Sequence, residues 1–166
     1  SYGQYIFSDN ARLKTNDDAL AAAGNNSLTD FGTVYIKNYH QPGMPQTAAS
    51  FGLEYRDPNF WWIGANVNYL ANSYVDFANI LRTDNFSIDS ATGDNYTGAT
   101  PETVRAILKQ EKFDSFTLVN LTGGKSWRIS KANRNTVGFF ASVNNVFDIQ
   151  YKTGGFEQSR KATFPD

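Results

Sequence analysis

The sequence predicts an all-β fold whose antiparallel strands run up and down, with short helices in the loops. Two observations carry this prediction. Apolar and polar side chains alternate with a period of two over long stretches, which is the pattern of strands with one apolar and one polar face. Short turns and long polar loops also alternate along the chain, as in an up-and-down barrel whose two rims differ.

The stretch from Trp61 to Phe77 shows this alternation most clearly. Its odd positions are nearly all apolar or aromatic, whereas its even positions include Asn66, Asn68 and Asp76. We therefore expect one strand from Trp61 to Phe77, far longer than the usual globular strand of about 5–6 residues. A strand of that length favours either an outer-membrane barrel or a large soluble β-fold.

Five further segments complete the predicted strand set. Clear alternation predicts strands over Ala49–Asp57, Val119–Ile129 and Val137–Tyr151. Weaker patterns predict a first strand from Gly3 to Leu13 and a second over Gly32–Tyr39, followed by the turn Gln41-Pro42-Gly43. The sequence thus indicates about six strands.

The segments between the strands carry turn and helix signals. Asp57-Pro58-Asn59 predicts a tight turn, and the polar run Ser130–Asn135 predicts another short connection. A long polar excursion runs from Ala78 to about Glu111 and contains a predicted helix from Pro101 to about Gln110, with Thr100 as its N-cap.

Near the N-terminus, Asn16-Asp17-Asp18 before Ala19–Ala23, closed by Gly24, predicts a short helical turn.

Composition excludes several classes of function. The 166 residues carry 15 Lys and Arg against 16 Asp and Glu, so the net charge of −1 offers no basic field for nucleic acid. Cysteine is absent and His40 is the single histidine, which excludes disulfides and thiol chemistry and gives no support to a metal site. No acid, base and nucleophile converge in the sequence, so we predict no catalytic residue, no metal site, no cofactor and no enzyme activity.

Several motifs resemble a known family. Asn144-Asn145-Val146-Phe147-Asp148 is similar to the Asn-x-Phe-Asp signature near the end of TonB-dependent outer-membrane transporter barrels. The following segments resemble the C-terminal barrel of the SusC-like branch of Bacteroides-type bacteria (Bacteroidetes), over roughly residues 32–162: Gly43-Met44-Pro45-Gln46-Thr47-Ala48, Tyr55-Arg56, Phe60-Trp61-Trp62, Asn68-Tyr69, Tyr74-Val75-Asp76-Phe77, Arg82-Thr83, Gly124-Lys125-Ser126-Trp127-Arg128 and Tyr151-Lys152-Thr153-Gly154-Gly155.

The resemblance implies a fold and a transport role in the bacterial outer membrane. Members have an N-terminal plug inside a 22-stranded barrel, and a SusD-like lipoprotein caps the outer mouth. They import oligosaccharides, and in some cases peptides, with energy from inner-membrane TonB. The resemblance implies that residues 1–166 are a C-terminal portion of such a barrel, about six strands long, without the plug domain and the last strand.

The alternation assigns residues to two environments in such a barrel. An aromatic girdle at the membrane interface would include Phe60, Trp61, Trp62 and Trp127. Lys125 falls on the lipid side with Trp127, and either its stem snorkels to the rim or a bulge at Gly123-Gly124 turns it inward. The expected lumen-facing residues are Glu54, Arg56, Asn66, Asn68, Asn120, Asn144 and Asp148.

Two other functions stay open on the sequence. The first is a soluble secreted β-sandwich that binds carbohydrate through Trp61, Trp62 or Trp127. The second is a small stand-alone outer-membrane barrel with a structural or adhesive role. Dependence on detergent for solubility would separate the two membrane-barrel hypotheses from the soluble carbohydrate-binding module.

Overall fold

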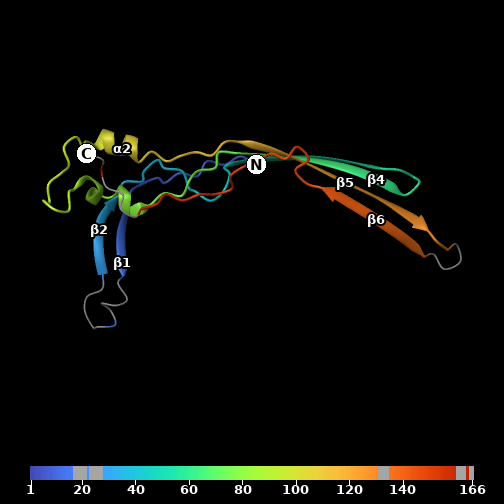
Figure 1. Cartoon of the computed structure of the whole chain (residues 1–166), viewed down its shortest axis with the longest axis horizontal. Helices are drawn as coiled ribbons and strands as arrows, with labels where there is room; N and C mark the ends of the chain where they lie inside the picture. Colours follow the sequence, from blue (N-terminus) through green and yellow to red (C-terminus); the bar gives the residue numbers. More distant parts are fainter. Residues whose placement is uncertain (17–21, 23–27, 131–134, 160–163, 165–166) are drawn as a thin grey trace. The chain divides into compact units, whose positions relative to one another are not determined.

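Antiparallel strands dominate the computed structural model, which describes residues 1–16, 22, 28–130, 135–159 and 164. The strands form a four-stranded sheet and a separate two-stranded sheet (Figure 1). An all-β antiparallel fold is therefore confirmed. The chain divides into two units: Ser1–Gly3, Pro45–Ser73 and Phe113–Thr153 form the first, and Gln4–Met44, Tyr74–Lys112 and Gly154–Asp166 form the second.

The first unit is built on a four-stranded antiparallel meander. Its strands are β3 (Thr47–Arg56), β4 (Trp61–Ala71), β5 (Phe116–Arg128) and β6 (Thr136–Val143), and they lie side by side in sequence order. The three strands predicted with clear alternation before residue 130 are therefore present, and neighbouring strands run up and down as expected. The segment 131–134, which holds most of the predicted Ser130–Asn135 connection, lies outside the described residues.

The β3–β4 connection confirms the predicted tight turn. The backbone N–H of Asp57 donates to the carbonyl of Trp61 at 2.8 Å, and the N–H of Phe60 donates to the carbonyl of Asp57 at 3.0 Å. The Asp57 carboxylate also accepts the backbone N–H of Asn59 at 2.8 Å, which is a local bond that Asp forms readily in turns. Phe60 completes the connection in the left-handed region, with φ of 61°.

Two predicted strands end earlier than the alternation suggested. The strand expected to reach Phe77 stops at Ala71, where Asn72 takes a φ of 60° and leaves the extended conformation. The strand expected to reach Tyr151 stops at Val143, and Asn145 follows with a φ of 52°. Asn adopts the left-handed region more readily than most residues, and each of these two residues interrupts the ladder. Isolated contacts resume beyond them, namely the bridge between Tyr74 and Lys112 and the bond from the Val146 N–H to the Val119 carbonyl at 2.8 Å.

The second unit holds the short strands and the long excursion. Strand β1 (Ala11–Asn16) pairs with β2 (Leu28–Val34), so the strands expected over Gly3–Leu13 and Gly32–Tyr39 are wrong in their bounds. The number of strands among the described residues agrees with the six predicted, but β1 and β2 form a sheet of their own, so the structure shows two antiparallel sheets. The helical turn predicted over Asn16–Gly24 falls largely outside the described residues.

The long excursion folds into three short helices around a small core. Two 3-10 turns, η1 (Asn79–Arg82) and η2 (Asp84–Ser87), precede helix α2 (Pro101–Ile107). The predicted start of α2 is confirmed, because Thr100 Oγ1 accepts the N–H of Thr103 at 3.2 Å, but the helix ends before Gln110. A buried cluster of Leu81, Phe86, Leu108 and Phe164 forms the centre of this excursion.

Candidate functional site

One face of the four-stranded sheet is apolar across all four strands. The register places Leu53, Ala65, Leu121 and Val143 in one row across the sheet. Directly paired residues share a face, so this row and its neighbours form a continuous surface. Many of its large side chains are at least 38% exposed, including Phe51, Leu53, Ile63, Leu121, Val137 and Phe139, whereas Val67 and Val119 near its centre are half-buried. The surface has no second layer of sheet within the described part of its own unit.

The opposite face carries a ladder of polar side chains on β3 and β4. Ser50 Oγ donates to Asn68 Oδ1 at 2.8 Å, and Asn66 Nδ2 donates to Ser50 Oγ at 3.0 Å. Asn68 Nδ2 in turn donates to Asn66 Oδ1. Cross-strand pairs of this kind stabilise a sheet, and here they also satisfy three polar side chains among themselves.

Glu54 and Arg56 continue this polar face toward the β3–β4 turn. Arg56 Nε lies 2.5 Å from Glu54 Oε1, and the Arg56 guanidinium lies 5.9 Å from the centre of the Trp62 ring. The Trp62 indole covers Gly124 on β5, where an added Cβ would lie 2.7 Å from the indole Nε1. Glycine at this position therefore makes room for the tryptophan ring.

The remaining polar residues of the predicted site separate into two groups. Asn120 lies on β5 opposite Asn66, so Glu54, Arg56, Asn66, Asn68 and Asn120 share one face. The structure does not place the last two predicted residues, Asn144 and Asp148, on that face by strand alternation. Both lie beyond the end of β6, and Asp148 takes a φ of 50°.

The aromatic cluster after the β3–β4 turn is divided between the two faces. Trp61 packs against Tyr55 on the apolar face, with ring centres 5.3 Å apart. Trp62 points to the polar face with Arg56, and Phe60 lies in the turn with 63% of its surface exposed. Trp127 lies on the apolar face of β5 near the same end of the sheet.

Lys125 lies on the apolar face, in one row with Trp61 and Phe139. The register of β5 with both neighbouring strands runs through Gly123 and Gly124 without interruption, so the bulge considered from the sequence is absent. The Lys125 Nζ lies 5.6 Å from the centre of the Trp127 ring. A cation over an aromatic face is one way in which a lysine is held on an apolar surface.

The second unit contains a cavity of about 680 Å³ that the sequence did not reveal. Two of its lining residues are the aromatic Tyr35 and Tyr39. The pKa of Tyr35 is raised, mainly by the hydrogen bond between its phenol and the Asp84 carboxylate. The charged lining residues are Arg82, Asp84, Glu102 and Arg105. Cavities of this size with mixed aromatic and polar walls accept small molecules.

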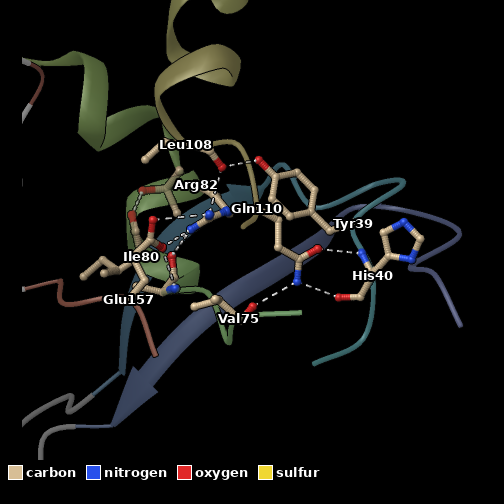
Figure 2. Close-up of polar contacts among 10 residues, drawn as sticks. Tyr39, His40, Val75, Ile80, Arg82, Leu108, Gln110 and Glu157 are labelled. Carbon is tan, nitrogen blue, oxygen red and sulfur yellow. Dashed lines mark hydrogen bonds and ion pairs between the residues drawn. The ribbon is translucent and has the colours of Figure 1, made fainter. Parts of the chain in front are cut away.

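Arg82 joins the cavity wall to the rest of the second unit (Figure 2). Its side chain is only 2% exposed and pairs with the Glu157 carboxylate. Its Nη1 donates to the Ala78 carbonyl at 3.1 Å, and its Nη2 donates to the Leu108 carbonyl at 2.9 Å. The guanidinium also lies about equally close to two aromatic rings, 5.0 Å from that of Tyr39 and 4.9 Å from that of Phe77.

Gln110 makes a second set of bonds beside Arg82 (Figure 2). Its Oε1 accepts the backbone N–H of His40 at 2.8 Å, and its Nε2 donates to the His40 carbonyl at 2.9 Å and to the Val75 carbonyl at 3.0 Å. One side chain thus holds two segments that lie 35 residues or more from it in sequence. The His40 ring stacks on Tyr74, with ring centres 3.9 Å apart.

Sequence reasoning missed Arg82 because its partners are distant. Glu157 lies 75 residues away, and no local pattern announces a pair at that separation. The one usable signal was an arginine directly after the apolar pair Ile80-Leu81 inside an otherwise polar excursion. A charge in an apolar setting usually has a partner, because an unpaired buried charge is costly.

In the part of the chain that the structure describes, no three His, Asp or Glu side chains gather to hold a metal ion. No helix there is long and apolar enough to cross a membrane. No family model, no curated protein and no solved structure matches this chain. The fold therefore defines the class of protein only as an all-β antiparallel one.

Proposed function

We propose that this chain is a segment of the barrel wall of a SusC-like, TonB-dependent importer in the bacterial outer membrane. The supporting observation is the exposed apolar face of the β3–β6 sheet, opposite a face with a hydrogen-bonded Asn and Ser ladder. Lipid contacts only alternate side chains of a barrel strand, so one apolar and one polar face are what such a wall needs. The motifs that resemble the SusC-like family supply the finer assignment.

In this proposal the two faces have different partners. Phe51, Leu53 and Ile63 contact outer-membrane lipid, and the polar face turns to the lumen. Glu54, Arg56, Asn66, Asn68 and Asn120 then bond across strands or to the plug. The strands β3 to β6 would be part of a 22-stranded wall, with the turn at Asp57 on the short-turn rim.

The aromatic residues near the short turn support the same orientation. Trp61 and Trp127 lie on the apolar face, where Trp rings at the headgroup level anchor a barrel. The neighbouring Lys125 reaches the same interface, where its ammonium stays hydrated. Trp62 is on the other face, so we assign it to the lumen side of the rim.

The family resemblance supplies the remaining partners, which would act at the barrel rim that carries the long loops. The excursion from Ala78 to Glu111 would extend outside the cell, where a SusD-like lipoprotein covers the mouth. Cargo would be an oligosaccharide or a peptide, and TonB would act through the N-terminal plug. We propose no catalytic activity for this chain.

A soluble carbohydrate-binding module is the second candidate. Its support is the exposure of flat aromatic rings, 38% for Trp61 and 48% for Trp127, on one surface. A β-sandwich buries one face of each sheet against another sheet. The β3–β6 sheet lacks such a second sheet in its own unit, and for this reason we rank the module second.

Fractionation of the full-length protein separates the two candidates. For the importer we expect the protein in the outer-membrane fraction, released by detergent and not by salt or buffer. A protein that is soluble and monodisperse in plain buffer contradicts the membrane assignment and favours the binding module. A plug domain encoded upstream in the same gene would separate an importer from a small stand-alone barrel.

A further inference from the structure

A short C-terminal segment, Gly155–Glu157, lies along the start of the long excursion in the second unit. The backbone N–H of Asp76 donates to the Gly155 carbonyl at 2.9 Å, and the N–H of Glu157 donates to the Asp76 carbonyl at 2.8 Å. Glu157 Oε2 also accepts the backbone N–H of Ala78 at 2.9 Å. The segment is thus attached by backbone hydrogen bonds to Asp76 and by the Glu157 carboxylate, which accepts the N–H of Ala78.

The Glu157 carboxylate is the only acidic partner of Arg82 among the ion pairs of the described residues. The Arg82 side chain is 2% exposed, and its buried Nε has no hydrogen-bond partner, so the guanidinium already lacks one bond. Glu157, in contrast, is 27% exposed and accessible to solvent. Loss of the carboxylate would leave a buried cation with neutral partners alone, which is strongly unfavourable.

Arg82 also fixes three walls of the cavity. It is a lining residue itself, it donates to the carbonyl of Leu108, and its guanidinium lies over the Tyr39 ring. Tyr39 and Leu108 line the same cavity, and the Tyr39 hydroxyl donates to the Leu108 carbonyl at 2.8 Å. Arg82 therefore contacts both neighbouring lining residues, the ring of Tyr39 and the backbone of Leu108.

We propose that Gly155–Glu157 is a releasable strap that controls access to this cavity. With Glu157 on Arg82, the walls formed by Tyr39, Arg82 and Leu108 are held in place. When the strap leaves, Arg82 loses its carboxylate, moves toward water and releases the other two walls. The strap concerns the second unit alone and does not depend on the membrane assignment.

The test uses one engineered cysteine as a reporter in the full-length protein. The chain has no cysteine, so Ser87→Cys places a single thiol of this chain in the cavity lining. Glu157→Gln keeps the size of the side chain and removes its charge. We expect the maleimide labelling rate at position 87 to rise about tenfold, because a hydrogen bond to a charged group is stronger than one to a neutral group by about 1.4 kcal/mol, which corresponds to a factor of ten.

Glu102→Gln is the matched control, because Glu102 also lines the cavity and is not among the residues that bond Arg82. In this variant the labelling rate at position 87 is expected to stay within about twofold of the parent, since a surface substitution that does not touch the Arg82–Glu157 pair changes stability little. Hydrogen exchange at Ala78 reports strap release, and exchange along β4 reports general unfolding. Faster labelling with faster exchange at Ala78 and unchanged β4 supports the strap. An unchanged labelling rate, or a rise that β4 shares, overturns it.

Discussion

The side chain of Asn145 forms two hydrogen bonds with the backbone of Ile149. Asn145 Oδ1 accepts the Ile149 N–H at 3.0 Å, and Asn145 Nδ2 donates to the Ile149 carbonyl at 3.0 Å. The backbone N–H of Asn145 also donates to Asn120 Oδ1 on β5 at 2.9 Å. These bonds close a turn directly after β6. They give a structural role to Asn145, the asparagine of the Asn145-Val146-Phe147-Asp148 motif.

Asn145→Ala is expected to lower the free energy of unfolding of the first unit by about 3–4 kcal/mol. The change removes both side-chain bonds, each worth about 1 kcal/mol, and adds about 1–2 kcal/mol for a residue other than Asn or Gly at φ of 52°. Asn145→Gly removes the same bonds and tolerates the φ, so its loss should be smaller. Urea unfolding of the complete protein measures both, and equal losses would contradict the role of the backbone conformation.

The face assignment predicts different effects for two adjacent residues. Val67 lies on the apolar face between Phe51 and Val119, and Asn68 lies on the polar face beside Ser50. In a membrane barrel Val67→Arg is expected to cost about 2–4 kcal/mol, since a cation at mid-depth in lipid is poorly solvated. Asn68→Arg is the matched control and should cost less. Equal folding free energies in lipid vesicles would refute the assignment of faces.

Phe60 offers a test of the β3–β4 turn. Its φ of 61° is unfavourable for an aromatic residue, and glycine adopts this conformation without strain. We expect Phe60→Gly to stabilise the turn by about 1 kcal/mol relative to Phe60→Ala, because both variants lose the ring and only one relieves the strain. The difference between the two unfolding free energies isolates the backbone term. Equal unfolding free energies for the two variants would show that the backbone conformation at Phe60 is not strained.

The same turn predicts a dependence on pH. The pKa of Asp57 lies below its ordinary value of 3.8, chiefly because the backbone N–H of Asn59 donates to the carboxylate. A lowered pKa in the folded state stabilises the fold above the unfolded value, and this contribution disappears as pH falls through the folded pKa. We therefore expect the stability difference between the parent and Asp57→Asn to be constant well above 3.8 and to change only below it. A difference that changes near neutral pH would contradict this origin.

Arg82→Lys tests the geometry of the buried cation in the second unit. Lysine keeps the charge but cannot bond Glu157, Ala78 and Leu108 through a planar fork. We expect the second unit to lose less stability than the roughly 3–5 kcal/mol found when one partner of a buried pair is removed, because lysine keeps the charge and loses only hydrogen bonds. Local hydrogen exchange in α2 measures this loss. Full protection in the lysine variant would show that charge alone suffices.

The exposed apolar face predicts how residues 1–166 behave when they are expressed alone. Among the described residues, β6 and most of β3 have no partner strand on their outer edges, since β3 is contacted there only at its start, by the bridge between Tyr2 and Thr47. Unpaired strand edges promote association. We expect residues 1–166 expressed alone to associate or aggregate in buffer instead of forming a stable monomer. Unfolding that is cooperative and independent of concentration would contradict this expectation and favour the soluble module.

The sequence predicted the central strands better than their ends. Period-two alternation from Ala49 to Asp57 and from Val119 to Ile129 corresponds to β3 and β5, because each residue contributes to the pattern. The early ends of β4 and β6 depend on one backbone conformation each, at Asn72 and Asn145. The alternation of side chains continues past both residues, so the pattern alone could not locate them.

The sequence by itself determined which side chains share a face of the four-stranded sheet, because that follows from the pleat of each strand. The tertiary structure decided that β1 and β2 form a separate sheet, and that Arg82 meets Glu157 beside a cavity. The Arg82–Glu157 pair joins residues 75 positions apart in the chain, and the pairing of β1 with β2 spans a connection of more than ten residues. Such contacts are set by the packing of the whole unit, and local spacing carries no record of them.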